Sequence, residues 1–143
     1  MHERIYIGIG SNLGQRHATI HAGVRSLNAH AAIEVVRLSS IIETDPVGPA
    51  GQGPYLNAAC EVRTSFGPRE LLDAMLEIER VHGRDRSKEQ RWGARTLDLD
   101  LLLFRDVVID EDGLTVPHPR MHERSFVMIP LRELRSHLAS IRG

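Results

Sequence analysis

The stretch from Thr96 to Phe104 alternates polar and apolar residues, which is the period of a β-strand with one buried face. Its odd-numbered residues would point into a core, and all four are leucines: Leu97, Leu99, Leu101 and Leu103. Asp98 and Asp100 would then project together from the opposite face, where two like charges repel each other unless a cation lies between them. Mg²⁺ is commonly held by one or two carboxylates together with substrate phosphates. The stretch therefore predicts a strand that carries a metal site.

A strongly basic segment precedes this strand. Between positions 80 and 95, Asp85 and Glu89 stand against six cationic residues: Arg80, Arg84, Arg86, Lys88, Arg91 and Arg95. The formal net charge of the whole chain is only −1, so the positive charge is local and suits a small anionic ligand better than a nucleic acid. Metal-binding carboxylates beside a cationic segment predict a polyphosphate site. The alternative is that Asp98 and Asp100 only form salt bridges with Arg84 or Arg95.

The length and composition indicate one soluble domain. A chain of 143 residues is large enough to bury a core, and we expect a single domain over residues 1–143. The lone cysteine, Cys60, lies in an apolar run and predicts a buried packing thiol in a reducing compartment. No apolar run approaches the roughly 18 residues that a membrane span requires. We therefore expect a cytoplasmic monomer with neither a membrane nor a nucleic-acid partner.

The order of expected elements predicts the fold class. Apolar periodicity and turn residues indicate a strand at 4–10, a helix at 15–29, a strand at 33–42, a strand at 55–63, a helix at 68–82 and the strand at 96–104. This order predicts an α+β, ferredoxin-like βαββαβ fold, in which an antiparallel sheet has helices packed on one face. We expect C-terminal additions as well: a short strand at 107–109, an extended segment at 114–119 and a helix at 126–138.

A glycine-rich segment invites a dinucleotide-binding interpretation. Gly8, Gly10 and Gly14 lie between an expected strand and an expected helix, but the last glycine comes one residue too late for the G-x-G-x-x-G pattern. We therefore interpret the glycines as the end of the strand and a turn.

The histidines and the tryptophan allow more than one interpretation. His17 and His21 are spaced as on one helix face, which is more typical of a solvated face than of a zinc site. His118 lies between two prolines and close to two arginines, so it can either hydrogen-bond a phosphate or pair with His122 at a metal. Trp92 lies in the basic segment, where it predicts a stacking surface for a planar ring or else a core anchor.

These motifs together resemble 6-hydroxymethyl-7,8-dihydropterin pyrophosphokinase, a folate-pathway family. The resemblance covers most of the chain and rests on six motifs: Gly10-Ser11-Asn12-Leu13-Gly14, Thr44-x-Pro46-x-Gly48, Tyr55-Leu56-Asn57, Gly83-Arg84-x-Arg86, the run from Arg91 to Asp100, and Val116-Pro117-His118-Pro119-x-Met121-x-x-Arg124-x-Phe126.

The resemblance implies transfer of pyrophosphate from ATP to the pterin hydroxymethyl group, with release of AMP and with two Mg²⁺ ions. It implies Asp98 and Asp100 as metal ligands, and Arg84 and Arg95 as catalytic residues that neutralise phosphate charge. It implies further contacts to ATP by a larger set: Glu79, Arg86, Lys88, Trp92, Leu101, Thr115, His118 and Arg124. It implies a pterin pocket formed by Thr44, Pro46, Val47, Tyr55, Asn57, Trp92 and Phe126.

Some positions depart from the family pattern. Asp45 stands where some members have proline, the segment from 86 to 92 is one residue longer than in some relatives, and Gly113 lies near a position that is basic in others. Two other functions stay open on the sequence alone: a non-catalytic ferredoxin-like binding module, and a metal-dependent phosphohydrolase that uses the same carboxylates.

Overall fold

The computed structural model describes residues 4–11, 16–44, 55–83 and 97–142. The elements in chain order are β1 (Ile5–Ser11), α1 (Arg16–Ala29), β2 (Ile33–Leu38), β3 (Ile42–Thr44), β4 (Tyr55–Thr64), α2 (Pro68–Val81), β5 (Asp98–Phe104), β6 (Ile109–Glu111), β7 (Leu114–Val116), a 3₁₀ turn (Met121–Glu123) and α3 (Ser125–Arg142). None of the helices in these described ranges is long and apolar enough to cross a membrane.

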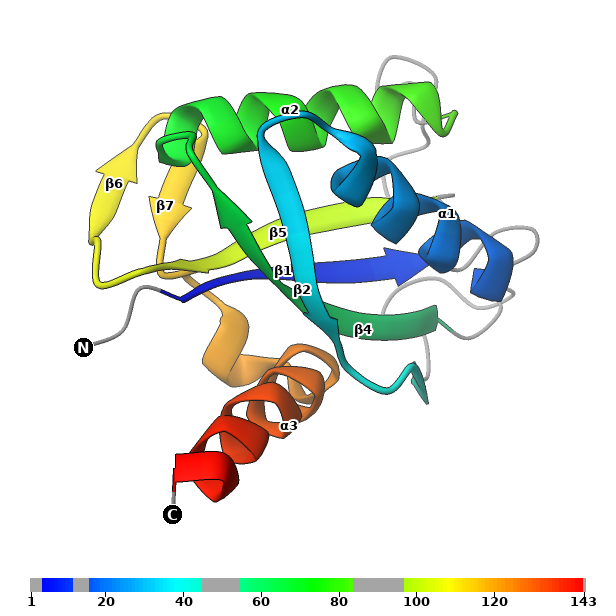
Figure 1. Cartoon of the computed structure of the whole chain (residues 1–143), viewed down its shortest axis with the longest axis vertical. Coiled ribbons are helices and arrows are strands. Elements are labelled where there is room, and N and C mark those ends of the chain that lie inside the picture. The colour runs from blue at the N-terminus through cyan, green and yellow to red at the C-terminus, as the bar shows by residue number, and fades with distance from the viewer. Residues whose placement is uncertain (1–3, 12–15, 45–54, 84–96, 143) are drawn as a thin grey trace.

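The main sheet is antiparallel and has the strand order β2-β4-β1-β5, with β3 paired to the part of β4 that β2 leaves uncovered. Helices α1 and α2 lie on one side of this sheet and α3 lies on the other, as Figure 1 shows. The prediction of an α+β, ferredoxin-like βαββαβ fold is thus confirmed. The C-terminal additions are the β6–β7 hairpin and α3, which covers the face that the first two helices leave open.

Each face of the sheet has its own apolar cluster. The cluster under α1 and α2 includes the leucines predicted to face a core, Leu97, Leu99 and Leu101. The cluster under α3 includes Leu102 and Leu131. The prediction that Leu103 shares a face with the other three leucines is wrong, because this side chain packs against the cluster under α3. The register between β1 and β5 shifts by one residue at this point, and such a bulge interrupts the alternation of side chains between the two faces.

Local sequence signals explain the bounds of α2. Pro68 occupies the first helical position, where its missing N–H costs nothing, and the Glu70 side chain accepts a hydrogen bond of 2.9 Å from the Gly67 amide. Gly83 follows the helix with a φ of +95°, a conformation that a residue without a Cβ adopts without strain. The α2 helix is therefore specified at both ends by the residues that flank it.

The hairpin after β5 differs from its prediction. The expected strand at 107–109 starts instead at Ile109 and continues through Glu111. Val107 and Val108 lie outside it and are exposed to solvent. The turn itself is confined to Asp112 and Gly113, and Gly113 has a φ of +76°. Val107 and Val108 favour a strand by their intrinsic propensity, but neither of them belongs to the β6–β7 strand pair.

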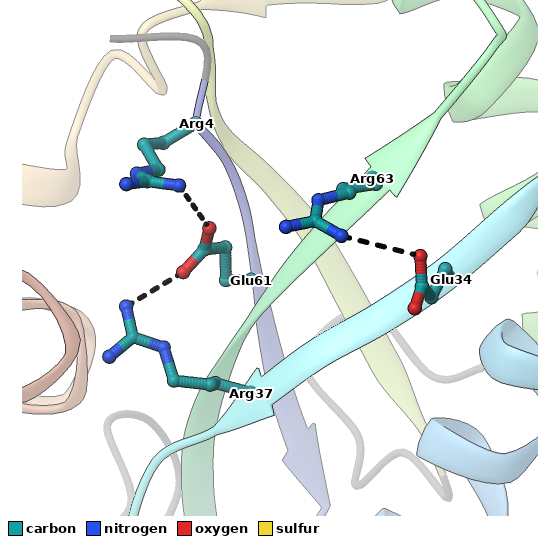
Figure 2. Close-up of polar contacts among 5 residues, drawn as sticks. All are labelled: Arg4, Glu34, Arg37, Glu61 and Arg63. Atoms are coloured by element: carbon teal, nitrogen blue, oxygen red, sulfur yellow. Dashed lines mark hydrogen bonds and ion pairs between the residues drawn. The ribbon is translucent and has the colours of Figure 1, made fainter.

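A buried carboxylate on the α3 face of the sheet links β4 to β2 and to Arg4, the residue that precedes β1. Glu61 on β4 forms ion pairs with Arg4 at 3.3 Å and with Arg37 on β2 at 2.8 Å (Figure 2). Next to it in sequence, Cys60 is fully buried on the opposite face, and burial raises the pKa of its thiol to about 12. The prediction of a packing thiol is thus confirmed.

Candidate active site

Two glycines of β1 leave a hollow on the α3 face of the sheet. Gly8 and Gly10 belong to the strand itself, which corrects the prediction that they end it. Gly10 lies between Asn57 on β4 and Asp98 on β5, and Gly8 lies between Ala59 and Asp100 in the same two strands. Because neither glycine carries a side chain, the carboxylates of β5 border an open floor. The predicted projection of Asp98 and Asp100 from one face is confirmed by their shared cavity.

The first cavity rises from this floor and has a volume of about 420 Å³. Its walls come from β4, from β5, from the first turn of α3 and from the residue before α3: Tyr55, Asn57, Asp98, Asp100, Arg124 and Phe126 are among the lining residues. Arg124 lies over the Phe126 ring, with its guanidinium carbon 5.7 Å from the ring centre. The cavity thus combines aromatic walls, one amide and opposite charges, which suits a planar polar ring that carries an anionic or metal-bound substituent.

The second cavity has a volume of about 330 Å³ and opens on the other side of β5. Most of its wall is apolar and comes from α2, β5, β7 and the segment after β7: Leu72, Leu76, Leu99, Leu101, Leu114 and Pro119. Its polar lining includes Asp100, Thr115 and His118. Asp100 therefore borders both cavities. The linings of the two cavities thus share one acidic residue, Asp100.

His118 is held rigidly beside the carboxylates. Its amide donates a hydrogen bond of 2.9 Å to the Leu102 carbonyl, and its Nδ1 accepts one of 3.3 Å from the Arg120 amide. Its Nε2 lies 4.0 Å from Oδ1 of Asp100. Burial lowers the pKa of His118 below its ordinary value, and the nearby charge of Arg124 lowers it further. Both effects favour the neutral form of the ring, which is directed towards Asp100.

Asp98 and Asp100 fit a magnesium ion better than a zinc ion. Oxygen ligands suit Mg²⁺, which usually takes one or two carboxylates from the protein and the remaining ligands from water and substrate phosphates. The described ranges of the chain hold no group of three or more histidine, cysteine, aspartate and glutamate side chains that could hold a metal ion. His17 and His21 are exposed on α1, as expected for a solvated face.

Glu79 is buried, in contrast to the other acidic residues of α2. Only 2% of its surface is exposed, and its Oε2 accepts a hydrogen bond of 2.7 Å from the Leu99 amide. Leu99 stands between Asp98 and Asp100 in β5. The Glu79 carboxylate is therefore linked to the strand that carries the two candidate metal ligands.

The structure brings together nine of the residues implied by the resemblance: Asp98, Asp100, Tyr55, Asn57, Phe126 and Arg124 around the first cavity, and Leu101, Thr115 and His118 around the second. Gly113 also lines the second cavity, and the Thr44 backbone pairs with Tyr55. Other expectations fall outside the described residues: Pro46, Val47, Arg84, Arg86, Lys88, Trp92 and Arg95, with Asp45 and the segment from 86 to 92.

The sequence analysis missed several residues that shape the site. Gly8 and Gly10 form its floor, and Leu72 and Leu76 form a wall of the second cavity. The glycines had a recognisable signal, because they are spaced by two in a strand, as the aspartates are. The leucines had none, since their pattern on α2 is equally typical of residues that face a core.

The matches with known proteins agree with this geometry. Residues 6–136 match the family model for 7,8-dihydro-6-hydroxymethylpterin-pyrophosphokinase. A 2-amino-4-hydroxy-6-hydroxymethyldihydropteridine pyrophosphokinase of Bacillus subtilis is 49% identical over 134 residues, which cover 94% of this chain and 79% of the relative. Proteins of the same name from Haemophilus influenzae and Pseudomonas aeruginosa are 41% and 40% identical, over 93% and 94% of this chain and 82% of each relative. Both cavities lie within the matched residues, and the chain belongs to the 7,8-dihydro-6-hydroxymethylpterin-pyrophosphokinase family.

Proposed function

We propose that the protein transfers the pyrophosphoryl group of ATP to the hydroxymethyl oxygen of 6-hydroxymethyl-7,8-dihydropterin, giving the pterin diphosphate and AMP in folate biosynthesis. The observation that carries the proposal is the position of Asp100, whose carboxylate borders two cavities of different character. A reaction between two substrates needs two binding sites that meet at the reacting atoms. Family membership supports the identity of the substrates.

The first cavity is the proposed pterin pocket. Tyr55 and Phe126 can cover the two faces of a flat bicyclic ring, and aromatic pairs of this kind favour stacked or edge-to-face contacts. Asn57 is only 7% exposed and offers an amide, which can both donate to and accept from the edge of a pterin. The Gly10 position below leaves room for the ring, since a Cβ there would lie 3.1 Å from Oδ1 of Asn57.

The second cavity is the proposed nucleotide pocket. Its leucines offer an apolar wall to a purine, and Leu101 and Thr115 line the same cavity as Asp100. His118 can donate a hydrogen bond to a phosphate, and Arg124 adds a positive charge on the side of the first cavity. Arg84 and Arg95 are proposed as catalytic residues, and Arg86, Lys88 and Trp92 as further contacts, on the strength of the resemblance alone.

Asp98 and Asp100 are the proposed ligands of magnesium. When bound, magnesium neutralises phosphate charge and makes a coordinated hydroxyl more acidic. Two carboxylates next to each other in one strand would destabilise the free sheet by their repulsion, and a cation removes that repulsion. We propose two ions, as the resemblance to the family implies.

In the proposed reaction the hydroxymethyl oxygen attacks the β-phosphorus of ATP, and the bond from this phosphorus to the α-phosphate oxygen breaks. The leaving group is AMP, and the hydroxyl proton passes to solvent. The walls of the two cavities hold the reactants in line, which turns an encounter of two molecules into a reaction within one complex. Arginine side chains that face the phosphates stabilise the charge that moves to the departing AMP. No side-chain base is required.

The test is the formation of AMP from ATP and Mg²⁺, measured with and without 6-hydroxymethyl-7,8-dihydropterin. The proposal predicts AMP and pterin diphosphate in equal amounts, and only when the pterin is present. Release of AMP or ADP without pterin would instead indicate a phosphohydrolase. Binding of both ligands without any product would indicate a non-catalytic binding module.

A further inference from the structure

The strand that carries the two carboxylates lies at the edge of the main sheet. β5 is the last strand in the order β2-β4-β1-β5, and β1 is its neighbour on the inner side. Gly8, Ile9 and Gly10 pair with Asp100, Leu99 and Asp98. Amides on the outer side of such a strand do not meet a neighbouring strand, and an edge strand is therefore less firmly held than a central one.

One amide on this outer side of β5, that of Leu99, is hydrogen-bonded to Glu79. The Leu99 amide, which lies between the two aspartates, donates to Oε2 of Glu79 at 2.7 Å, and both residues are buried. A hydrogen bond to a carboxylate is shorter and about twice as strong as one between neutral groups. A buried carboxylate is expensive unless it is hydrogen-bonded, so this contact fixes α2 and β5 against each other.

A second contact holds the residue before Asp98. Leu97 is fully buried and packs against α1 where that helix has a glycine, because a Cβ at Gly23 would lie only 2.9 Å from Cδ1 of Leu97. The chain is therefore held on both sides of Asp98, at Leu97 by packing and at Leu99 by a hydrogen bond. Neither Glu79 nor Gly23, the residues that make these two contacts, lines either of the two cavities.

We infer that Glu79 is a positioning residue, which sets the spacing and direction of Asp98 and Asp100 through the Leu99 backbone and so determines the affinity of the site for a metal–polyphosphate complex. The inference rests on the proposed function. Because Leu99 is bonded to both aspartates in the chain, a displacement of its amide moves both carboxylates at once. Displacements of about 1 Å are enough to weaken binding and catalysis at such a site.

The experiment measures Mn²⁺-dependent binding of two probes, ATP and inorganic tripolyphosphate, which has no base and no ribose. Glu79→Met removes the acceptor with little change of volume, and Glu79→Gln keeps an acceptor oxygen. Glu77→Met is the matched control, because Glu77 lies on the exposed face of the same helix and pairs with Arg80. Exchange of the Leu99 amide with solvent, followed by NMR, reports the hydrogen bond itself.

We expect Glu79→Met to weaken both probes by the same factor, about 10-fold, as for the loss of one hydrogen bond to a charged group. Glu79→Gln should restore most of the affinity, Glu77→Met should change nothing, and the Leu99 amide should exchange faster only in Glu79→Met. A loss for ATP without a loss for tripolyphosphate would mean that Glu79 contacts the nucleoside directly, and would overturn the inference. Faster exchange at Leu99 with unchanged affinity for both probes would overturn it as well.

Gly23→Ala provides a second route, should Glu79→Met not fold. The added methyl group displaces Leu97 and should weaken both probes in the same way, from a position in α1 outside both cavities. Unchanged binding in a folded Gly23→Ala protein with a displaced Leu97 would contradict the inference. None of these measurements needs pterin or turnover. A failure of the proposed reaction would therefore be seen separately, as absence of AMP.

Discussion

The two faces of the sheet are built from the same strands but have different tasks. On β1, Ile5, Ile7 and Ile9 face α1 and α2 and belong to a large apolar cluster. The residues between them on the other face are Tyr6, Gly8 and Gly10, which lie under α3 or under the first cavity. A strand with a period of two can thus specify a core with one set of residues and a binding site with the other.

The α3 face is itself divided. Towards one end Glu61 is buried between two arginines, and in the middle Leu102 and Leu131 pack together. Towards the other end two glycines stand where the opposite face has isoleucines, and the carboxylates border the space that they leave. The apolar contacts under α1 and α2 hold the strands in register. The other face can therefore carry two like charges, Asp98 and Asp100, at its open end.

The largest expected effect comes from removing one carboxylate at the junction of the cavities. Asp100→Ala should lower the turnover rate by on the order of 10³-fold, because a metal ligand is worth several kcal/mol in the transition state. Pterin affinity, measured by calorimetry, should change little.

The matched control is Asp110→Ala, which removes a carboxylate from the β6–β7 hairpin outside both cavities. It should leave turnover unchanged. Near-normal turnover of Asp100→Ala with Mg²⁺ would contradict the assignment of the metal ligands.

The next largest effect distinguishes the apolar cluster under α1 and α2 from the cluster under α3 by their influence on stability and on pterin binding. Leu27→Ala in α1 and Leu131→Ala in α3 both remove a fully buried side chain, and each should lower the free energy of unfolding by about 2–5 kcal/mol in chemical denaturation. Only Leu131→Ala should also weaken pterin binding, since α3 carries Phe126 and Val127 of the first cavity. Equal pterin affinities of the two variants would show that α3 does not shape the pocket.

A smaller effect is expected from filling the floor of the first cavity. Gly10→Ala places a Cβ 3.1 Å from Oδ1 of Asn57 and should raise the pterin dissociation constant about 10-fold or more, as expected for one methyl group in a tight pocket. Gly8→Ala is the matched variant, because its Cβ meets only Leu102 at the ordinary contact distance of 3.5 Å. If Gly8→Ala reduced pterin affinity as strongly as Gly10→Ala, the close contact between position 10 and Asn57 would not explain the loss of affinity.

The smallest effect concerns the pH dependence of stability. The folded protein binds a proton at His118 more weakly than the unfolded chain does, because burial, and then the charge of Arg124, lower its pKa from 6.5. The contribution of His118 to stability is therefore complete above pH 6.5 and is lost as the pH falls below that value. Denaturation curves between pH 7.5 and 5 should show a shallower loss of stability for His118→Asn than for the wild type.

His17→Asn is the control for this prediction, since His17 is exposed on α1. The difference between the two variants separates the effect of the buried His118 ring from the loss of a histidine as such. A His118→Asn protein with the same pH dependence as the wild type would contradict the effect of burial.

Much of the site was predictable from the sequence, because strand alternation alone places Asp98 and Asp100 on one face. The bulge in β5 was not, since Leu101, Leu102 and Leu103 are identical and no polar residue marks the change of face. The contact of Glu79 was not predictable either, because its partner is a backbone amide 20 residues away. A side-chain pattern carries no information about such a partner. The segments at 45–54 and 84–96 lie outside the described residues, so their predicted roles stay predictions.

The central claim is that Asp98 and Asp100 hold a divalent metal where the nucleotide and pterin cavities meet. The most direct measurement is a crystal structure with Mg²⁺, α,β-methylene ATP and 6-hydroxymethylpterin. We expect magnesium coordinated directly by both carboxylates, the pterin between Tyr55 and Phe126, and the purine against the leucines of the second cavity. A complex in which both carboxylates contact only protein groups, with metal and phosphates bound elsewhere, would contradict the claim.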